Sequence, residues 1–394
     1  SIGRYRTDNG IDRYRSLADK LGDRKDEFFA SPFFKLDAAA ARNDWSTLKS
    51  KWLDRLRHTG LFFPPDPGAR ATIGGMIANN ASGTRTVLYG STRDYVLRLV
   101  VALASGEIIE LGTRANKSSS GYALLHLFVG SEGTLGLVVE ATLRLVGAPA
   151  EVSAAVATFP TIAAAARAVF EIKRAGLNPA ALELLGPECV ALMNREEALD
   201  LALAPTLFLE FHGTGASQLA EGLEAAAEIC AAAGGIDFRP GLGRAERDRI
   251  FKARHGLGEM IQRNHPEHRI LVMDVAVPLT AYGELLAAMG EEVRAHGLTA
   301  YTLSHAGNGN VHHNIAGRKD DPAEWELVQQ VSGRIVRRAI ALGGTATGEH
   351  GVGLGKRRYM PLQHGPSLAW MRRVKELFDP RGILNPGKIF PVED

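Results

Sequence analysis

Beyond residue 150 the chain alternates between alanine-rich helical stretches and short apolar runs, and this alternation limits the folds it can adopt. The predicted helices are Ile162 to Ala175, Ser217 to Ala233, Ala281 to His296, Ala323 to Leu342 and Ser367 to Phe378. The predicted strands are Ala180 to Leu185, Thr206 to His212 and Ile270 to Val277. No βαβ crossover motif is visible, so antiparallel strands with helices on one face fit best. We therefore predict an α+β domain over residues 151–392.

Residues 59–147, which precede that domain, have a different sequence pattern that is rich in predicted strands. Short β-branched runs at Leu97 to Ala104, Glu107 to Leu111 and Leu137 to Val146 are broken by glycines, and Ser105-Gly106 is typical of a hairpin turn. Residues 147–151 form a predicted linker. Residues 1–58 are rich in charge and predicted to be helical and loop-like, with a helix from Ser46 to Leu56.

Composition narrows the class of ligand. The chain has 394 residues, of which 45% are hydrophobic and 23% charged, and its formal net charge is +2. No global field favours nucleic acid, so a small anion has to be recognised locally. Cys189 and Cys230 lack a metal or disulfide spacing and are predicted to be packing residues. With no long apolar run, a cytoplasmic location is expected, with peripheral membrane association as an alternative.

Two glycine clusters offer backbone to a ligand. The first runs from Pro64 to Gly83 and combines glycines with Thr72, Asn79 and Asn80. Glycine lets the backbone approach a flat or phosphorylated ligand, while Asn and Thr supply neutral donors and acceptors. A cofactor cradle and a set of tight turns both fit this segment. The second cluster, Gly130 to Gly136, is predicted to be a turn that enters the next strand with exposed amides.

A set of histidines and one glutamate between residues 304 and 352 indicates metal-assisted chemistry. His305 and His312 are seven residues apart, so on a straight strand they would face opposite sides, and Gly307 and Gly309 are expected to bend the chain. With Glu349 they make three candidate ligands for a divalent ion, the number typical of catalytic sites with open positions.

His350 follows Glu349 directly and is the candidate general base, because a neutral imidazole accepts a proton near pH 7. In the alternative, Glu349 only orients His350. His313 is expected to point away from His312 and to be structural. Arg254 lies in a helix rich in charge, where the pattern alone favours a solvated helix face over a carboxylate clamp.

Taken together, these motifs resemble the flavin-linked 2-hydroxy acid dehydrogenases of the vanillyl-alcohol oxidase/p-cresol methylhydroxylase superfamily. This group contains D-lactate dehydrogenase (cytochrome), D-2-hydroxyglutarate dehydrogenase and the glycolate oxidase flavin subunit. The resemblance covers residues 60–390. It implies a PCMH-type FAD-binding domain, truncated or altered at its N-terminus, followed by a ferredoxin-like α+β FAD-linked oxidase C-terminal domain.

The resemblance also implies roles for individual residues. The residues expected to line the FAD are Asp66, Pro67, Thr72, Gly74, Gly75, Asn80, Ser82, Gly83, Glu132, Gly133, Gly136 and Asn385. His305, His312 and Glu349 would hold a divalent metal, for which zinc, manganese and iron are all suitable. Arg254 would bind the substrate carboxylate, and His350 would be the base.

The implied reaction is oxidation of a small D-2-hydroxy acid, D-lactate or a glycolate-like acid, to the 2-oxo acid. Hydride passes to FAD and electrons leave to an external acceptor, which is a cytochrome, a quinone or an electron-transfer flavoprotein. A basic residue two positions before Asp274 would favour a dicarboxylate, whereas Val272 and Met273 precede it, which favours a monocarboxylate. Oligomeric state is left open, with a homodimer as one option.

Two departures from the family pattern stand out. Asn308 replaces an aspartate of the usual His-x-Gly-Asp-Gly-Asn-x-His motif, which removes a negative charge near the ion. The glycine-rich loop that holds the FAD pyrophosphate is missing from residues 1–58, so the chain is expected to be an incomplete or altered enzyme, or to bind FAD weakly. The alternative function is a noncatalytic metal-binding scaffold. An ether-lipid-forming flavoenzyme is disfavoured because it would not need the three metal ligands.

Overall fold

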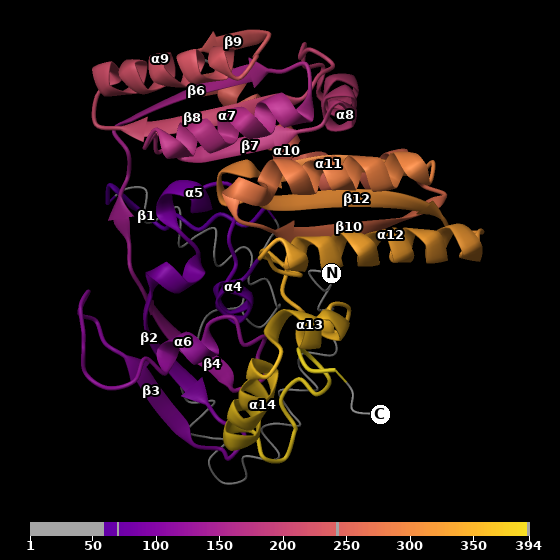
Figure 1. The fold of residues 1–394 in the computed structure, drawn as a ribbon. Coiled ribbons are helices and arrows are strands. Elements are labelled where there is room, and N and C mark those ends of the chain that lie inside the picture. The colour runs from indigo at the N-terminus through magenta and orange to yellow at the C-terminus, as the bar shows by residue number, and fades with distance from the viewer. Residues whose placement is uncertain (1–58, 69–70, 242–243, 392–394) are drawn as a thin grey trace. The chain divides into compact units, whose positions relative to one another are not determined.

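The computed structural model describes residues 59–68, 71–241 and 244–391, and the chain there forms two units (Figure 1). The first unit contains residues 59–82, 90–148 and 349–391, and the second contains residues 83–89 and 149–348. The chain therefore passes between the units four times. The helix predicted at Ser46 to Leu56, and the character predicted for residues 1–58, lie outside the described residues.

The first unit is built on a three-stranded antiparallel sheet with strand order β3-β2-β4. Its strands are β2 (Val96–Ala102), β3 (Ile108–Gly112) and β4 (Leu137–Leu143). The predicted hairpin turn is confirmed, because the amide of Leu103 bonds the carbonyl of Glu107 and Gly106 has φ +89°. β4 ends before the predicted Val146, which instead belongs to β5 (Val146–Gly147) and pairs with β1 (Leu61–Phe62).

The first unit also contains short helices. They are α4 (Ile73–Asn79), η2 (Thr92–Tyr95), α6 (Leu125–Phe128), η4 (Arg357–Tyr359), α13 (Met360–His364) and α14 (Ser367–Phe378). Of these, α4, α6 and α14 contribute to the core beneath the sheet. Ile77, Leu99 and Phe128 form the buried centre, and Phe378 of α14 packs edge-on against Phe128 at 5.1 Å between ring centroids. The C-terminal helix, whose bounds match the prediction, thus completes the core of this unit.

The first glycine cluster contains a helix, which the prediction of loops and tight turns missed. Thr72 caps α4 by accepting the amide hydrogen of Gly75, and Asn80 ends the helix in the left-handed region at φ +49°. Gly74 and Gly75 disfavour a helix intrinsically. Met76 and Ile77 are fully buried, so tertiary packing and the cap override that local preference.

The second unit is built on a seven-stranded sheet with strand order β10-β12-β11-β7-β8-β6-β9. Its strands are β6 (Glu151–Thr158), β7 (Ala181–Leu185), β8 (Thr206–Gly213), β9 (Asp237–Pro240), β10 (His268–Ala276), β11 (Thr299–His305) and β12 (Asn310–Arg318). Every strand pair is antiparallel, as predicted for an α+β domain. The connection between β5 and β6 falls where the linker was expected.

Helices cover both faces of this sheet, and the prediction of one covered face was wrong. The helices are α5 (Thr86–Tyr89), α7 (Ile162–Arg174), α8 (Pro187–Glu197), α9 (Ala216–Ala232), α10 (Arg244–Asn264), α11 (Leu279–Ala295) and α12 (Pro322–Ala341), with the short turn η3 (Ala306–Asn308). α8 and α10 pack on Leu185 and Leu303, while Tyr282 of α11 bonds Ser304 on the opposite face. β7 is apolar on both faces except for Glu183, because both are buried.

The two cysteines are packing residues, as predicted. Cys189 lies on α8 and Cys230 on α9, and both are buried and unpaired with each other. Burial raises the pKa of the Cys230 thiol to about 12, so it stays protonated. None of the helices in the described part of the chain has the length and apolarity needed to cross a membrane.

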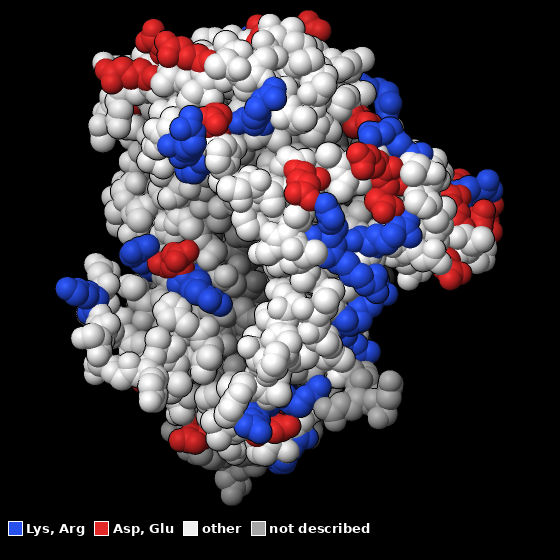
Figure 2. All heavy atoms as spheres, viewed as in Figure 1, with Lys and Arg blue, Asp and Glu red and all other residues white. Residues whose placement is uncertain are grey.

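Acidic and basic side chains alternate over the part of the second unit formed by α11 and α12 (Figure 2). Glu284 pairs there with Arg338, and Glu292 pairs with Arg334. Because both signs are interleaved, this surface carries no one-sided charge.

Candidate active site

The hairpin of β11 and β12 brings His305 and His312 together. His305 ends β11 and pairs with Asn310, while His312 pairs with Leu303, so the two imidazoles project from the same face of the sheet. Their ring centroids are 5.2 Å apart. The predicted glycine bend is confirmed: Gly309 has φ +64°, and a Cβ there would lie 2.1 Å from the Val277 carbonyl oxygen.

Glu183, on β7, is the acidic partner of His305. Its side chain is completely buried, and Oε1 lies 2.7 Å from His305 Nδ1. Burial by itself acts to raise the pKa of Glu183, but the charge of Arg254 and the bond to His305 lower it below its ordinary value. The carboxylate is therefore ionised at neutral pH. Sequence reasoning missed this residue.

Arg254, on α10, is buried and not on the solvated helix face that its sequence pattern favoured. It is 6% exposed, and its Nη2 atom lies 2.6 Å from Glu183 Oε2. A buried guanidinium needs an anionic partner, and no acidic residue lies three or four positions from Arg254 along its helix. Its Nε atom is buried and has no acceptor among the described residues.

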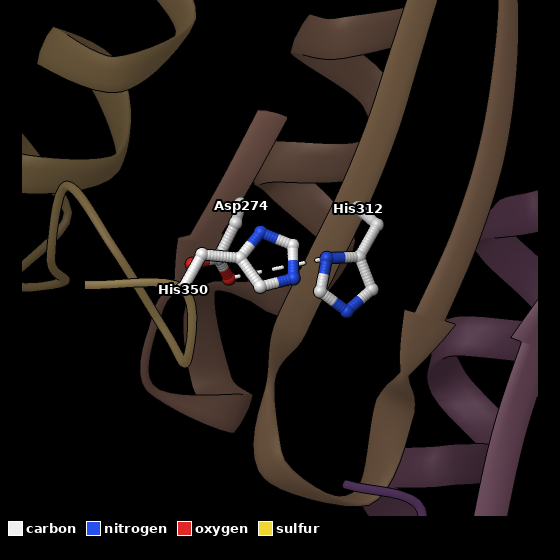
Figure 3. A group of neighbouring side chains, drawn as sticks. All are labelled: Asp274, His312 and His350. Atoms are coloured by element: carbon white, nitrogen blue, oxygen red, sulfur yellow. Dashed lines mark ion pairs between the residues drawn. The ribbon is translucent and has the colours of Figure 1, made fainter. Parts of the chain in front are cut away.

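Asp274 supports His312 from the neighbouring strand β10. The two residues are direct cross-strand partners, and Asp274 Oδ1 lies 3.9 Å from His312 Nδ1 (Figure 3). The carboxylate also accepts hydrogen bonds from Asn310 Nδ2, Thr347 Oγ1 and the amide of Gly348. Asp274 thus fixes the end of the second unit, one residue before Glu349.

Three residues close to His305 and His312 in the sequence, His313, Asn308 and Asn310, differ in burial and in hydrogen bonding. His313 projects from the opposite face of β12, as predicted, and bonds Thr302 Oγ1 at 3.0 Å. Burial lowers the pKa of His313 to about 4, so its ring is neutral at pH 7. Asn308 is exposed in the η3 turn, while Asn310 is the buried asparagine that bonds Asp274. The effect of Asn308 on metal affinity stays a prediction.

Glu349 and His350 lie in the first unit, on the loop that follows Gly348. His350 Nε2 is 3.3 Å from Glu349 Oε1, and Ser82 Oγ donates to Glu349 Oε2 at 3.3 Å. Both side chains are largely buried. This contact suits a carboxylate that orients the base and equally a carboxylate that binds an ion, so both predicted roles for Glu349 stay open.

The second glycine cluster anchors this loop to the first unit. Glu132 has φ +52°, is 7% exposed, and accepts hydrogen bonds from the amides of Val352 and Gly353. Asn385 Nδ2 donates to the Glu132 carbonyl oxygen. The turn predicted at 130–136 is there, but the prediction of exposed amides was wrong, because the amides of Gly130, Ser131, Glu132 and Thr134 donate to carbonyls of the same unit. Its contact with FAD stays a prediction.

The other predicted FAD-lining residues differ in what they offer a ligand. Gly74 and Gly75 are exposed in the first turn of α4, and a Cβ on Gly74 would meet no atom within 4 Å. The backbone of Gly74 is open to a ligand, whereas the amide of Gly75 is already bonded to Thr72 Oγ1. Asn80 Oδ1 is already bonded to Ser91 and Arg93. Gly136 is required by packing, because a Cβ there would lie 2.5 Å from Val101.

Asp66 and Pro67 are half-buried before α4, Thr72 caps that helix, and Gly83 is buried at the start of the segment in the second unit. Gly133 has φ +68°, and a Cβ there would lie 2.8 Å from Asn385 Nδ2, so glycine is needed at this position. Contact of these residues with FAD stays a prediction.

Comparison with known families decides the class of this chain. The model of the C-terminal domain of FAD linked oxidases matches residues 148–389, more than half of the chain. The chain belongs to the FAD-linked oxidase family. A FAD binding domain model matches residues 51–112. FAD is accordingly the cofactor of the family, as the resemblance implied.

The chain is also similar in sequence to proteins that are named as D-lactate dehydrogenases. The "Probable D-lactate dehydrogenase, mitochondrial" of Danio rerio is 40% identical over 341 residues, covering 86% of this chain and 68% of that protein. The "D-lactate dehydrogenase [cytochrome], mitochondrial" of Arabidopsis thaliana is 36% identical and covers 86% of this chain. The chain spans 60% of the length of that second relative.

Among solved structures, the fold is similar to that of 4-ethylphenol oxidase from Gulosibacter chungangensis. The TM-score is 0.67 at 16% identity, over 86% of this chain and 74% of the oxidase. At that identity the likeness concerns the fold alone, and it agrees with the predicted combination of a FAD-binding domain and an α+β oxidase domain.

Proposed function

We propose that this protein oxidises a D-2-hydroxy acid, D-lactate or a glycolate-like monocarboxylate, to the corresponding 2-oxo acid. The observation that carries the proposal is the buried pair of imidazoles, His305 and His312, with Arg254 beside His305. The names of the relatives as D-lactate dehydrogenases support it. Electrons would leave to a cytochrome, a quinone or an electron-transfer flavoprotein.

The residues fit both groups that the reaction needs. Two buried imidazoles are common ligands of zinc, manganese and iron, and Glu183 holds His305 through Nδ1, so Nε2 would be its ligating atom. Glu349 is the proposed third ligand. It follows Gly348 directly in the chain, and the amide of Gly348 donates a hydrogen bond to Asp274, the cross-strand neighbour of His312. For FAD, the open space beside Gly74 suits close approach of the backbone.

When bound, FAD supplies a hydride acceptor and the divalent ion supplies a Lewis acid for the hydroxyl oxygen. Arg254 binds the substrate carboxylate with the guanidinium hydrogens that Glu183 does not use, among them the buried N–H at Nε. His350 removes the hydroxyl proton, and Glu349 keeps its ring in place.

The proposed monocarboxylate specificity rests on β10. Val272 shares a strand face with Asp274, because the two are two positions apart in β10, and it is 44% exposed. An apolar side chain at that position offers no charge to a second substrate carboxylate. We expect D-lactate to be preferred over D-2-hydroxyglutarate.

Anaerobic bleaching of the flavin tests the proposal. D-lactate should reduce bound FAD and L-lactate should not. His350→Ala should keep FAD but lose reduction by about 10²–10⁴-fold, the usual contribution of a general base. His364→Ala, at the end of α13 in the same unit, is the matched control and should reduce FAD normally. Unchanged reduction in His350→Ala, or protein that stays colourless after FAD is added, would contradict the proposal.

Metal identity, a homodimer and a cytoplasmic location stay predictions. Dialysis against a chelator should lower the rate of flavin reduction, and the ion that restores it identifies the metal. Light scattering of the purified protein measures its oligomeric state.

A further inference from the structure

We propose that Glu183 is a positioning residue that holds a metal-binding imidazole and the substrate-binding arginine with one carboxylate. This inference rests on the proposed function, since a metal ion and a hydroxy acid are what His305 and Arg254 would bind. It adds a residue that neither the sequence motifs nor the family resemblance singled out.

Each carboxylate oxygen of Glu183 faces a basic side chain, through a hydrogen bond on one side and an ion pair on the other. Oε1 lies 2.7 Å from His305 Nδ1, and Oε2 lies 2.6 Å from Arg254 Nη2. The three residues come from β7, β11 and α10, and all are at most 7% exposed. A buried carboxylate with two such partners is a fixed reference point between them, because water does not compete for its oxygens.

One carboxylate decides the tautomer of His305. Arg254 Nη2 also lies 3.4 Å from His305 Nδ1, but a guanidinium only donates. An ionised carboxylate only accepts, so the 2.7 Å contact requires a hydrogen on Nδ1. Nε2 then carries the lone pair. The 3.4 Å contact is therefore a close approach of two donors that each face a different oxygen of the same carboxylate.

The arrangement gives Glu183 two effects. It orients the His305 ring and makes Nε2 a better ligand, as carboxylates behind metal-bound histidines generally do. It also keeps the guanidinium of Arg254 in one orientation, so less side-chain freedom is lost when a substrate carboxylate binds. Metal affinity and substrate affinity should therefore both depend on Glu183.

Glu183→Gln tests both effects, since glutamine keeps the shape and removes the charge. The dissociation constant of the metal-stripped protein for Mn²⁺ or Zn²⁺ should rise about 10–100-fold, measured by calorimetric titration. In the metal-loaded enzyme, the KM for D-lactate should rise about tenfold. Without the charge of Glu183, the guanidinium of Arg254 is no longer held in place for its charge-assisted hydrogen bond to the substrate carboxylate. Glu183→Asp keeps the charge and should recover part of the metal affinity.

Glu188→Gln is the matched control. Glu188 lies five residues further on, at the start of α8, and is exposed. Its substitution should leave metal affinity and KM unchanged. If wild-type protein binds metal and is reduced by D-lactate, and Glu183→Gln does both equally well, the inference is overturned while the proposed function stands. If wild type does neither, the proposed function itself fails.

The tautomer of His305 tests the same idea in the unaltered protein. In ¹⁵N-histidine-labelled protein without metal, His305 should show the hydrogen on Nδ1, assigned by comparison with a His305→Gln variant. A hydrogen on Nε2 would overturn the inference even if Glu183→Gln did not fold.

Discussion

Glu183 and Glu210 are buried carboxylates on adjacent strands of one sheet, β7 and β8, and each holds an imidazole at 2.7 Å. They differ in which nitrogen they hold and in what else the ring binds. Glu183 holds Nδ1 of His305. Glu210 holds Nε2 of His212, and Nδ1 of His212 is bonded to Tyr89 at 2.7 Å. Both nitrogens of His212 are thus occupied, so it is poorly suited to bind a metal.

The cations around the two carboxylates differ as well. Arg254 is buried and lies 2.6 Å from Glu183, whereas Arg85 and Arg247 lie 3.8 Å from Glu210 with side chains 35% and 21% exposed. The Glu210 cluster joins residues 83–89 to the sheet through Tyr89 and Arg85, so we expect it to have a structural role. A carboxylate next to a histidine is therefore not a signature of a site until the second nitrogen and the neighbouring cations are known.

The largest expected difference between the two clusters is the loss of stability when Arg254 or Arg247 is replaced. Arg254→Leu leaves the buried charge of Glu183 short of its main partner and should lower the free energy of unfolding by about 3–5 kcal/mol. Arg247→Leu removes a partly exposed, longer contact and should lower it by at most about 1 kcal/mol. Urea denaturation of the FAD-bound proteins measures both. Equal losses would remove the distinction between the two clusters.

Glu210→Gln should separate stability from metal binding. The variant weakens the bond to His212 and should lower the free energy of unfolding by about 1–3 kcal/mol. Its affinity for Mn²⁺ should match that of wild type, unlike that of Glu183→Gln. A weaker metal affinity in Glu210→Gln would mean that the second cluster also supports the metal site.

The pH dependence of that stability difference sharpens the comparison. Burial acts to raise the pKa of Glu210, but His212, Arg85 and Arg247 lower it below the ordinary value of 4.5. Its contribution to stability is therefore complete above pH 4.5 and lost as pH falls through the lowered value. The difference in unfolding free energy between wild type and Glu210→Gln should shrink when urea titrations are moved from pH 6 to pH 3. A difference that grows on acidification would show that the pKa is raised.

Tyr89→Phe is expected to have a smaller effect than Glu210→Gln. It removes the hydrogen bond to His212 Nδ1 and should lower the free energy of unfolding by about 0.5–1.5 kcal/mol. Flavin reduction by D-lactate should continue, since neither Tyr89 nor His212 is among the proposed catalytic residues. Thermal unfolding and the anaerobic spectrum of one sample test both statements. Loss of reduction with unchanged stability would assign the cluster to the active site.

Much of the second unit was predictable because its signals are local. The periodicity of residues 162–175 and 323–342 predicted α7 and α12 to within a residue or two of their ends. Gly307 and Gly309 predicted the bend between His305 and His312, and the two-residue period of a strand placed His313 on the opposite face. These features depend on neighbours within a few positions of the chain.

The sequence by itself determined the family, the α+β class and the histidine hairpin, because each depends on motifs of neighbouring residues. Only the tertiary structure decided that α4 is a helix, that both faces of the large sheet are covered and that Arg254 is buried. It also supplied Glu183, which lies 122 positions from His305. Burial and charge pairing over such separations arise when strands and helices pack, and local patterns do not record which residues will meet.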